Sequence, residues 1–123
     1  MSRPAPILLI DDDDDSRDGL AIVLRANGFS VEAVADGHTA VAKLSAGLCP
    51  SIILMDLLMP GMSAGEVRRQ QLLNPAVRAV PVIVLSGAED IECQAAALSA
   101  AAYVTKPIAL DRLIVIIRQH CAK

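Results

Sequence analysis

The sequence predicts an α/β fold in which a doubly wound, five-stranded parallel sheet carries helices on both faces. Five short apolar runs alternate with five amphipathic segments of helical length. This alternation is typical of successive βα units joined by right-handed crossovers. The 123 residues are 54% hydrophobic and 20% charged, and they include no internal repeat, linker or low-complexity tract. We therefore expect one ordered domain over 1–123, large enough to bury a core without disulfides or metal.

The predicted strands are short runs of aliphatic residues. Pro50 precedes the third run, and the first run leads directly into a series of aspartates. The expected strands are 7–10, 31–34, 52–55, 80–85 and 102–105.

The predicted helices follow these strands in turn. Residues at helical spacing support the first helix (Leu20, Val23, Leu24, Asn27), the second (Val41, Leu44, Ser45) and the last (Leu113, Ile116, Ile117). Gly28 stops the first helix and Gly37 opens the second. The expected helices are about 15–27, 38–46, 65–73, 90–100 and 110–121.

Composition excludes several classes of function. The net charge is −3 and the Lys and Arg residues are scattered, so direct binding of nucleic acid is not expected. Three cysteines without a short spacing, Cys49, Cys93 and Cys121, suggest neither a disulfide framework nor a zinc site, but buried or idle thiols in a reducing compartment. The start MSRPAP lacks the apolar core of a signal peptide, and no run is long enough to span a membrane. We expect a cytoplasmic protein without a membrane partner.

Acidic residues stand where ligands bind in such a sheet. Ligands of parallel α/β sheets bind at the carboxyl ends of strands, where strand order reverses. Asp11 and Asp12 follow the first strand, within a run of five aspartates; Asp56, Ser86 and Lys106 end the third, fourth and fifth strands. We therefore expect carboxylates, a hydroxyl and an ammonium on one rim of the sheet.

These groups indicate phosphoryl-transfer chemistry. Three carboxylates from two strands repel one another unless a cation neutralises them, and Mg²⁺ suits a site with two or three protein oxygens. Phosphoryl transfer depends mainly on positioning and charge neutralisation. Asp56 is the predicted nucleophile, which would give an aspartyl phosphate.

The motifs and their order resemble the receiver domain of two-component response regulators. The matching pieces are IDDD at 10–13, ADG at 35–37, DLLMPGM at 56–62, LSG at 85–87 and YVTKP at 103–107. The resemblance extends from end to end. It implies the flavodoxin-like (βα)5 fold with strand order 2-1-3-4-5 and no output domain in this chain.

The resemblance also implies a role for each matching residue. Asp56 would accept a phosphoryl group from a phosphohistidine on a sensor histidine kinase or a histidine phosphotransfer protein. Asp12 would ligate Mg²⁺ directly, and Asp11 would do so through water or act as a supporting carboxylate; Asp56 and the Leu58 carbonyl would complete the ligands. Ser86 and Lys106 would contact the phosphoryl oxygens. The remaining implied features are Tyr103 as the switch aromatic and a cis bond before Pro107.

Simpler interpretations accompany several of these residues. The run of aspartates can be a solvated acidic loop, in which Asp14 or Asp15 caps the following helix and Asp13 has either role. Ser86 alone would be a loop serine, and Tyr103 can be a core residue with a hydrogen-bonded hydroxyl.

The sequence departs from the family pattern at three places. Ser63-Ala64 replaces the usual Asp-Gly, so the loop into the third helix is expected to bend differently. Ser99 stands where a glycine usually ends the fourth helix, which suggests an altered or longer helix. Leu58 and Ala88, two residues after Asp56 and Ser86, are apolar; we expect them to orient no attacking water and the phosphate to be long-lived.

The leading hypothesis is a signalling phosphoacceptor, not an enzyme acting on other molecules. Its expected output surface is the fourth helix, fifth strand and fifth helix, with contributions from Ile91, Ala95, Tyr103 and Leu110, and its target is a downstream protein. The alternative is a receiver-like interaction module that works without phosphorylation. A phosphatase is disfavoured because Leu58 replaces the second Asp of an Asp-x-Asp pair. A nucleotide or flavin binder is disfavoured because aspartates follow the first strand.

Overall fold

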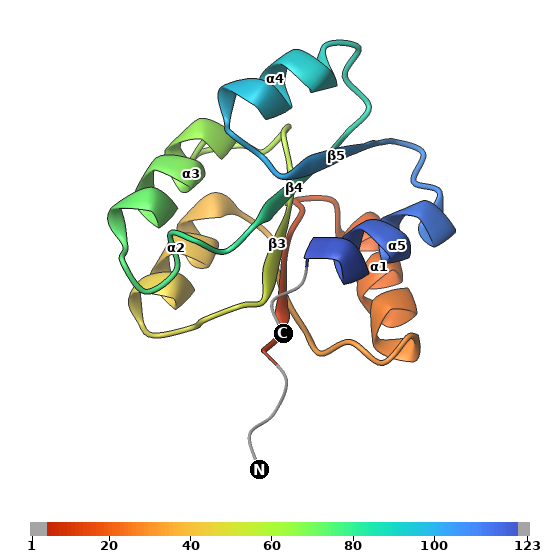
Figure 1. Cartoon of the computed structure of the whole chain (residues 1–123), viewed down its shortest axis with the longest axis horizontal. Helices are drawn as coiled ribbons and strands as arrows, with labels where there is room; N and C mark the ends of the chain where they lie inside the picture. The colour runs from red at the N-terminus through yellow and green to blue at the C-terminus, as the bar shows by residue number, and fades with distance from the viewer. Residues whose placement is uncertain (1–4, 121–123) are drawn as a thin grey trace.

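A computed structural model describes residues 5–120 of the chain, which form a five-stranded parallel sheet between two layers of helices (Figure 1). The strand order is β2-β1-β3-β4-β5, as the resemblance implies. The elements in chain order are β1 (Ile7–Ile10), α1 (Asp14–Ala26), β2 (Val31–Val34), α2 (Gly37–Ser45), β3 (Ile52–Asp56), α3 (Ala64–Leu73), β4 (Val82–Ser86), α4 (Ile91–Ala97), β5 (Ala102–Thr105) and α5 (Leu110–His120).

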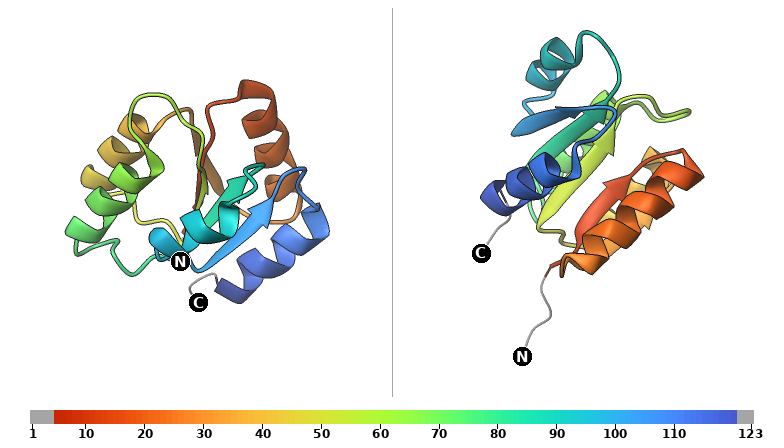
Figure 2. Two further views of the ribbon diagram at one scale, coloured as in Figure 1. Left: turned by 90° about the horizontal axis from the view of Figure 1, so that it is seen from above. Right: turned by 90° about the vertical axis from the view of Figure 1, so that its right-hand side faces the viewer.

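Alternate residues of the strands face opposite helical layers. Leu9 and Leu54 pack with α1 and α5, whereas Leu8 and Met55 pack with α2, α3 and α4. Figure 2 shows α1 and α5 on one side of the sheet and α2 and α3 on the other. Burial on both faces explains why the strands are continuous apolar runs rather than alternating ones.

The ends of α1 follow local rules. Asp13 is its N-cap, and its side chain accepts the Ser16 amide at 2.8 Å. The prediction that Asp14 or Asp15 caps this helix is wrong: both lie in the first turn, where they complement the positive end of the helix dipole. Gly28, with a φ of 92°, ends the helix as predicted.

Strand β4 begins later than predicted, at Val82 rather than at residue 80. The Val80 amide is bonded to the Val77 carbonyl in the turn after α3. Pro81 has no N–H to donate to the ladder of a central strand, so the strand starts after it.

Helix α4 ends earlier than predicted, at Ala97, and the expectation of a longer helix is wrong. Ser99 itself adopts the left-handed conformation, with a φ of 54°. The amides of Ser99 and Ala100 bond the carbonyls of Ala96 and Ala95, the pattern of a Schellman motif. Serine therefore fills the position that glycine accepts more readily.

Other expectations also change at the surface. Ile91 and Ala95 are buried, so their predicted place on the output surface is wrong; spaced four residues apart, they form the core-facing stripe of α4. Cys49 and Cys93 are exposed rather than buried.

Ser63 caps α3 by accepting the Glu66 amide at 3.1 Å. Cys121, the predicted helix end at 121 and residues 1–4 lie outside the described residues.

Candidate functional site

The parallel register brings the predicted site residues to one edge of the sheet. Strands β1, β3, β4 and β5 are consecutive neighbours, so their carboxyl ends lie side by side. Asp56 and Ser86 are the last residues of β3 and β4, Asp11 directly follows β1, and Lys106 directly follows β5. The structure thus brings together residues separated by as many as ninety-five positions in sequence.

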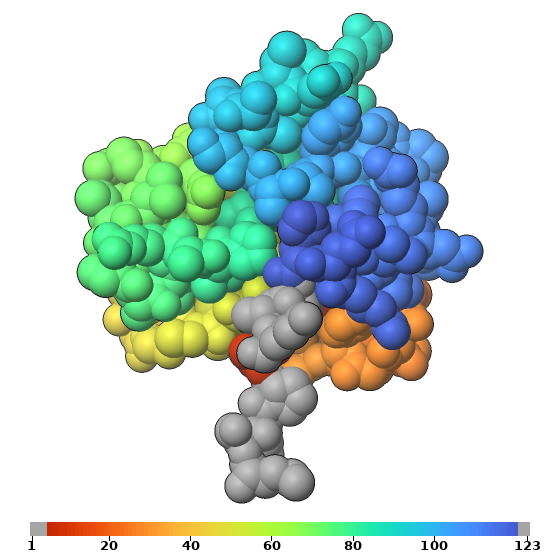
Figure 3. Space-filling model, in the orientation of Figure 1, coloured from red at the N-terminus to blue at the C-terminus, as the bar shows by residue number. Residues whose placement is uncertain are grey.

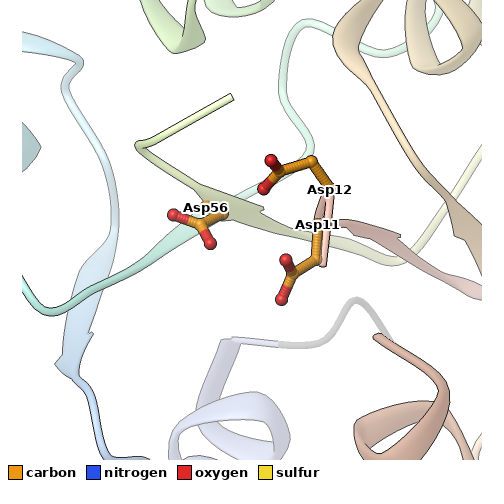
Figure 4. A group of neighbouring side chains, drawn as sticks. All are labelled: Asp11, Asp12 and Asp56. Carbon is orange, nitrogen blue, oxygen red and sulfur yellow. The ribbon is translucent and has the colours of Figure 1, made fainter. Parts of the chain in front are cut away.

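Three carboxylates form the centre of this site. One oxygen each of Asp11, Asp12 and Asp56 lies within 4.8 Å of the others (Figure 4). Asp11 and Asp56 are buried, whereas Asp12 is exposed to solvent. Such a cluster concentrates negative charge at a place that solvent reaches from one side, and its donors are all oxygen atoms.

Lys106 provides the counter-charge. Its Nζ donates to Asp56 Oδ2 at 2.8 Å and lies 3.6 Å from Asp11 Oδ2. Burial lowers the pKa of Lys106, but the hydrogen bond and charge of Asp56, together with the charge of Asp11, more than offset this and leave the pKa above its ordinary value. The ammonium is therefore charged at neutral pH. The Lys106–Pro107 peptide bond is cis, as the resemblance implies.

Asp11 is held by its own loop. Its Oδ1 accepts the Asp13 amide at 3.0 Å. Burial raises its pKa; that amide and Lys106 lower it, while the charges of Asp56 and Asp12 raise it, and the pKa lies above its ordinary value. Arg17, which sequence reasoning missed, donates to the Asp11 carbonyl at 3.0 Å and to Asp14 at 2.6 Å. Its place two residues after the acidic run was the available signal.

The loop after Asp56 also points back to it. The Leu58 amide donates to Asp56 Oδ1 at 2.9 Å, so both oxygens of Asp56 have a donor. The Leu58 side chain is 70% exposed, which leaves an apolar group at the mouth of the site.

Ser86 and Tyr103 occupy different surroundings. Ser86 is buried at the strand end, and its Oγ accepts the Ala88 amide at 3.0 Å. Tyr103 pairs with Val84 across β4 and β5 and is half-buried in a groove with Glu92 and Ala96 of α4. The geometry fits either a switch aromatic or a residue at the core margin.

An apolar groove of about 430 Å³ opens beside the carboxylates. It runs between α1 and the segment 106–110. Its walls include Leu20, Val23, Ile108 and Leu110, with Asp11 and Lys106 at one end.

Comparison with known proteins agrees with this geometry. The family model of the response regulator receiver domain matches residues 7–118. The chain belongs to the response regulator receiver family. Its receiver domain is 39% identical over 116 residues to the sensory transduction protein RegX3 of Mycobacterium bovis, and 36% identical over 113 residues to the response regulator MprA of Mycolicibacterium vanbaalenii.

These matches cover 91% and 90% of this chain but 48% of each relative, so the chain spans about half the length of these curated relatives. Among solved structures, the receiver domain of sensor histidine kinase PA1611 from Pseudomonas aeruginosa is 27% identical, with a TM-score of 0.84 and coverage of 96% of this chain and 98% of that one. That structure has a magnesium ion coordinated in its active-site cleft. Residues 5–120 of the present receiver domain contain no helix long and apolar enough to cross a membrane.

Proposed function

We propose that this receiver domain is a phosphorylation-controlled switch in a two-component phosphorelay. Asp56 takes a phosphoryl group from a phosphohistidine of a sensor histidine kinase or histidine phosphotransfer protein, and the altered face of α4, β5 and α5 then binds a downstream protein in the cytoplasm. One observation carries the proposal, namely the surroundings of Asp56. One carboxylate oxygen each of Asp56, Asp11 and Asp12 lies within 4.8 Å of the others, and Asp56 accepts a hydrogen bond from Lys106 at 2.8 Å.

The donor set fits Mg²⁺. Carboxylate oxygens are the ligands that hard cations prefer, and one ammonium does not balance three carboxylates. Burial of Asp11, which raises its pKa, adds to the advantage of a bound cation. Asp11, Asp12, Asp56 and the Leu58 carbonyl would hold the ion. When bound, Mg²⁺ neutralises charge on the phosphoryl oxygens.

The transfer itself is a displacement at phosphorus. A carboxylate oxygen of Asp56 forms the new P–O bond while the P–N bond to the donor imidazole breaks, and the imidazole leaves with that electron pair. Lys106 then donates a hydrogen bond to a phosphoryl oxygen in place of its hydrogen bond to Asp56. Ser86 can donate its hydroxyl proton to another phosphoryl oxygen, because within residues 5–120 its Oγ serves as an acceptor, for the Ala88 amide. The shift of Ser86 would carry the signal toward α4 and Tyr103.

The surfaces suit two successive partners. The apolar groove between α1 and residues 106–110 offers the donor a contact area next to Asp56. On the output side, the exposed residues of α4 are Glu92, Cys93, Ala96 and Ala97, and these replace Ile91 and Ala95 in the proposed surface. Tyr103 and Leu110 remain part of it.

We also propose that the phosphorylated form is long-lived. The exposed side chain beside Asp56 is Leu58, which cannot orient an attacking water by hydrogen bonding. Ala88 is similarly apolar. Loss of the phosphate within seconds in purified protein with Mg²⁺ would contradict this.

Intact mass after incubation with acetyl phosphate and Mg²⁺ tests the proposal. We expect gain of one phosphoryl group, which is lost in Asp56→Asn and on adding a chelator. No gain in folded protein at saturating Mg²⁺ would contradict the switch and favour the phosphorylation-independent module.

A further inference from the structure

Hydrogen bonds join α3 to the C-terminal end of α4. Arg68 of α3 donates through Nε to the Leu98 carbonyl at 2.8 Å and through Nη2 to the Ser99 carbonyl at 3.1 Å. These bonds span thirty residues of sequence and connect two helices on the same side of the sheet (Figure 1). Leu98 is the C-cap of α4, which ends at Ala97, and Ser99 follows it, so Arg68 contacts the chain just where a helix leaves its last carbonyls without intrahelical partners.

The guanidinium group of Arg68 is itself fixed. Its Nη1 donates to Gln71 Oε1 at 2.7 Å. Gln71 is buried, and its Nε2 donates to the carbonyls of Val77 and Val80 at 3.0 and 2.9 Å. The backbone carbonyls thus hold Gln71, and Gln71 holds the guanidinium group, which limits the positions that Arg68 can adopt.

The two ends of α4 are held in different ways. A helix C-terminus carries partial negative charge and favours a cation, but the last turn of α4 has no basic residue; Arg68 supplies the charge from another helix. At the N-terminus, Asp90 makes no capping hydrogen bond and instead bonds the Gln94 side chain at 2.7 Å. In the space-filling view, α4 and the loop leading into it project at one edge of the molecule (Figure 3).

We infer that Arg68 is a positioning residue that fixes the C-terminal end of α4, so that α4 moves between the two states of the switch by pivoting about Leu98 and Ser99. This inference rests on the proposed function for the origin of the movement. Ser86 and residues 87–90 lie at the opposite end of α4, which is where a phosphoryl group on Asp56 would act first. The planar fork of arginine is needed because three acceptors in different directions are bonded at once.

Hydrogen exchange in the unphosphorylated full chain tests the anchor by itself. The amides of Leu98, Ser99 and Ala100 bond within the end of α4 and report on it. We expect Arg68→Ala to speed their exchange at least tenfold and Arg68→Lys to do so less. The matched control is Arg69→Ala: Arg69 is the next residue, is exposed and pairs with Glu66 on its own helix. It should leave these amides unchanged.

Two results would overturn the anchor. One is equal exchange at 98–100 in Arg68→Ala and Arg69→Ala. The other is an acceleration in Arg68→Ala that is as large for β1 and β3 as for α4, because that would be general destabilisation.

A second arm tests the pivot, with Mg²⁺ and beryllofluoride as a phosphoryl mimic. In the native sequence, exchange should change at residues 87–92 and stay constant at 98–100; in Arg68→Ala the change should reach 98–100. Equal changes at both ends in the native sequence would overturn the pivot. If beryllofluoride does not bind, the proposed function fails, and the unphosphorylated arm still decides whether Arg68 anchors α4.

Discussion

Helices α1 and α4 both begin beside the acidic site, but only α1 carries strong signals at both of its own ends. Helix α1 has thirteen residues, an aspartate that caps its first amides and a glycine at the left-handed position that ends it. Helix α4 has seven residues, no capping bond from Asp90 and a serine at that left-handed position.

Under the proposed function, this difference would separate a helix that stays fixed, α1, from a helix that responds to the site, α4. A helix of seven residues has little stability of its own, and α4 depends on burial of Ile91 and Ala95 and on Arg68. Segments of this kind open locally at lower free energy than the core around them. Asp11 and Asp12 thus lead into α1, whereas Ser86 and the loop that would transmit the state of the site lead into α4.

The largest expected effect concerns the buried face of α1. Leu24 of α1 is fully buried, so Leu24→Ala should lower the free energy of unfolding by about 2–5 kcal/mol, through lost burial and the cavity left behind. Chemical denaturation measures this. The control is Ile22→Ala on the same helix, 65% exposed, which should change stability little. Similar losses in both variants would show that α1 is not packed as described.

The caps compare the two helices directly. Asp13→Ala removes the bond to the Ser16 amide and should reduce the folded-to-unfolded ratio about fivefold. Asp90→Ala removes no capping bond and should change this ratio less than about twofold. Denaturation curves of the two variants decide the matter; equal losses would remove the proposed asymmetry of the N-termini.

The left-handed residues that follow α1 and α4 are Gly28 and Ser99, and each can be replaced by the type found at the other. Ser99→Gly relieves a left-handed serine and should raise the free energy of unfolding by about 1 kcal/mol. Gly28→Ser imposes a similar strain on α1 and should lower it by about 1 kcal/mol; a Cβ at Gly28 meets no atom within 4 Å beyond its chain neighbours, so backbone strain is the expected cause. Thermal unfolding of both variants is the measurement. Changes of the same sign would contradict the interpretation.

The smallest effect is a dependence on pH at the cap of α1. The Ser16 amide lowers the pKa of Asp13 below its ordinary value of 3.8. A lowered folded pKa gives stability that is present above the unfolded value and is lost as pH falls through the folded one. Relative to Asp13→Asn, which caps without charge, the native protein should therefore lose stability as the pH falls from about 5 through the folded pKa, which lies below 3.8. Chemical denaturation of both proteins over that range is the measurement. An equal dependence of their unfolding free energies on pH would contradict the prediction.

Sequence patterns predicted most of the fold because its signals are local. The five strands were each placed within two residues at either end, the first helix ends one residue before its predicted position, and the last helix begins at the predicted residue. Errors occurred where a backbone requirement outweighed the apolar pattern: Pro81 delays β4, and Ser99 accepts a conformation usually left to glycine. Asp13 rather than its neighbours caps α1 because the choice among consecutive aspartates depends on the dihedral angles of each.

The site was predictable because motif order places four strand ends on one edge, and the structure does bring Asp11, Asp12, Asp56 and Lys106 together. The Mg²⁺ ligands and the roles of Ser86 and Tyr103 stay predictions. Arg17 and Arg68 were missed because each also donates to backbone carbonyls, six and about thirty residues away, and contacts of that kind leave no trace in residue type. The burial of Ile91 and Ala95 was available in principle from their spacing on α4.

The aromatic content of the chain has a practical consequence. The sequence contains one tyrosine and no tryptophan, and that tyrosine, Tyr103 of β5, is half-buried beside α4. Its ultraviolet emission therefore arises at the proposed output surface and, apart from weak emission by one phenylalanine, nowhere else in the chain. A change in the surroundings of Tyr103 can thus be followed optically, in native protein, without any label.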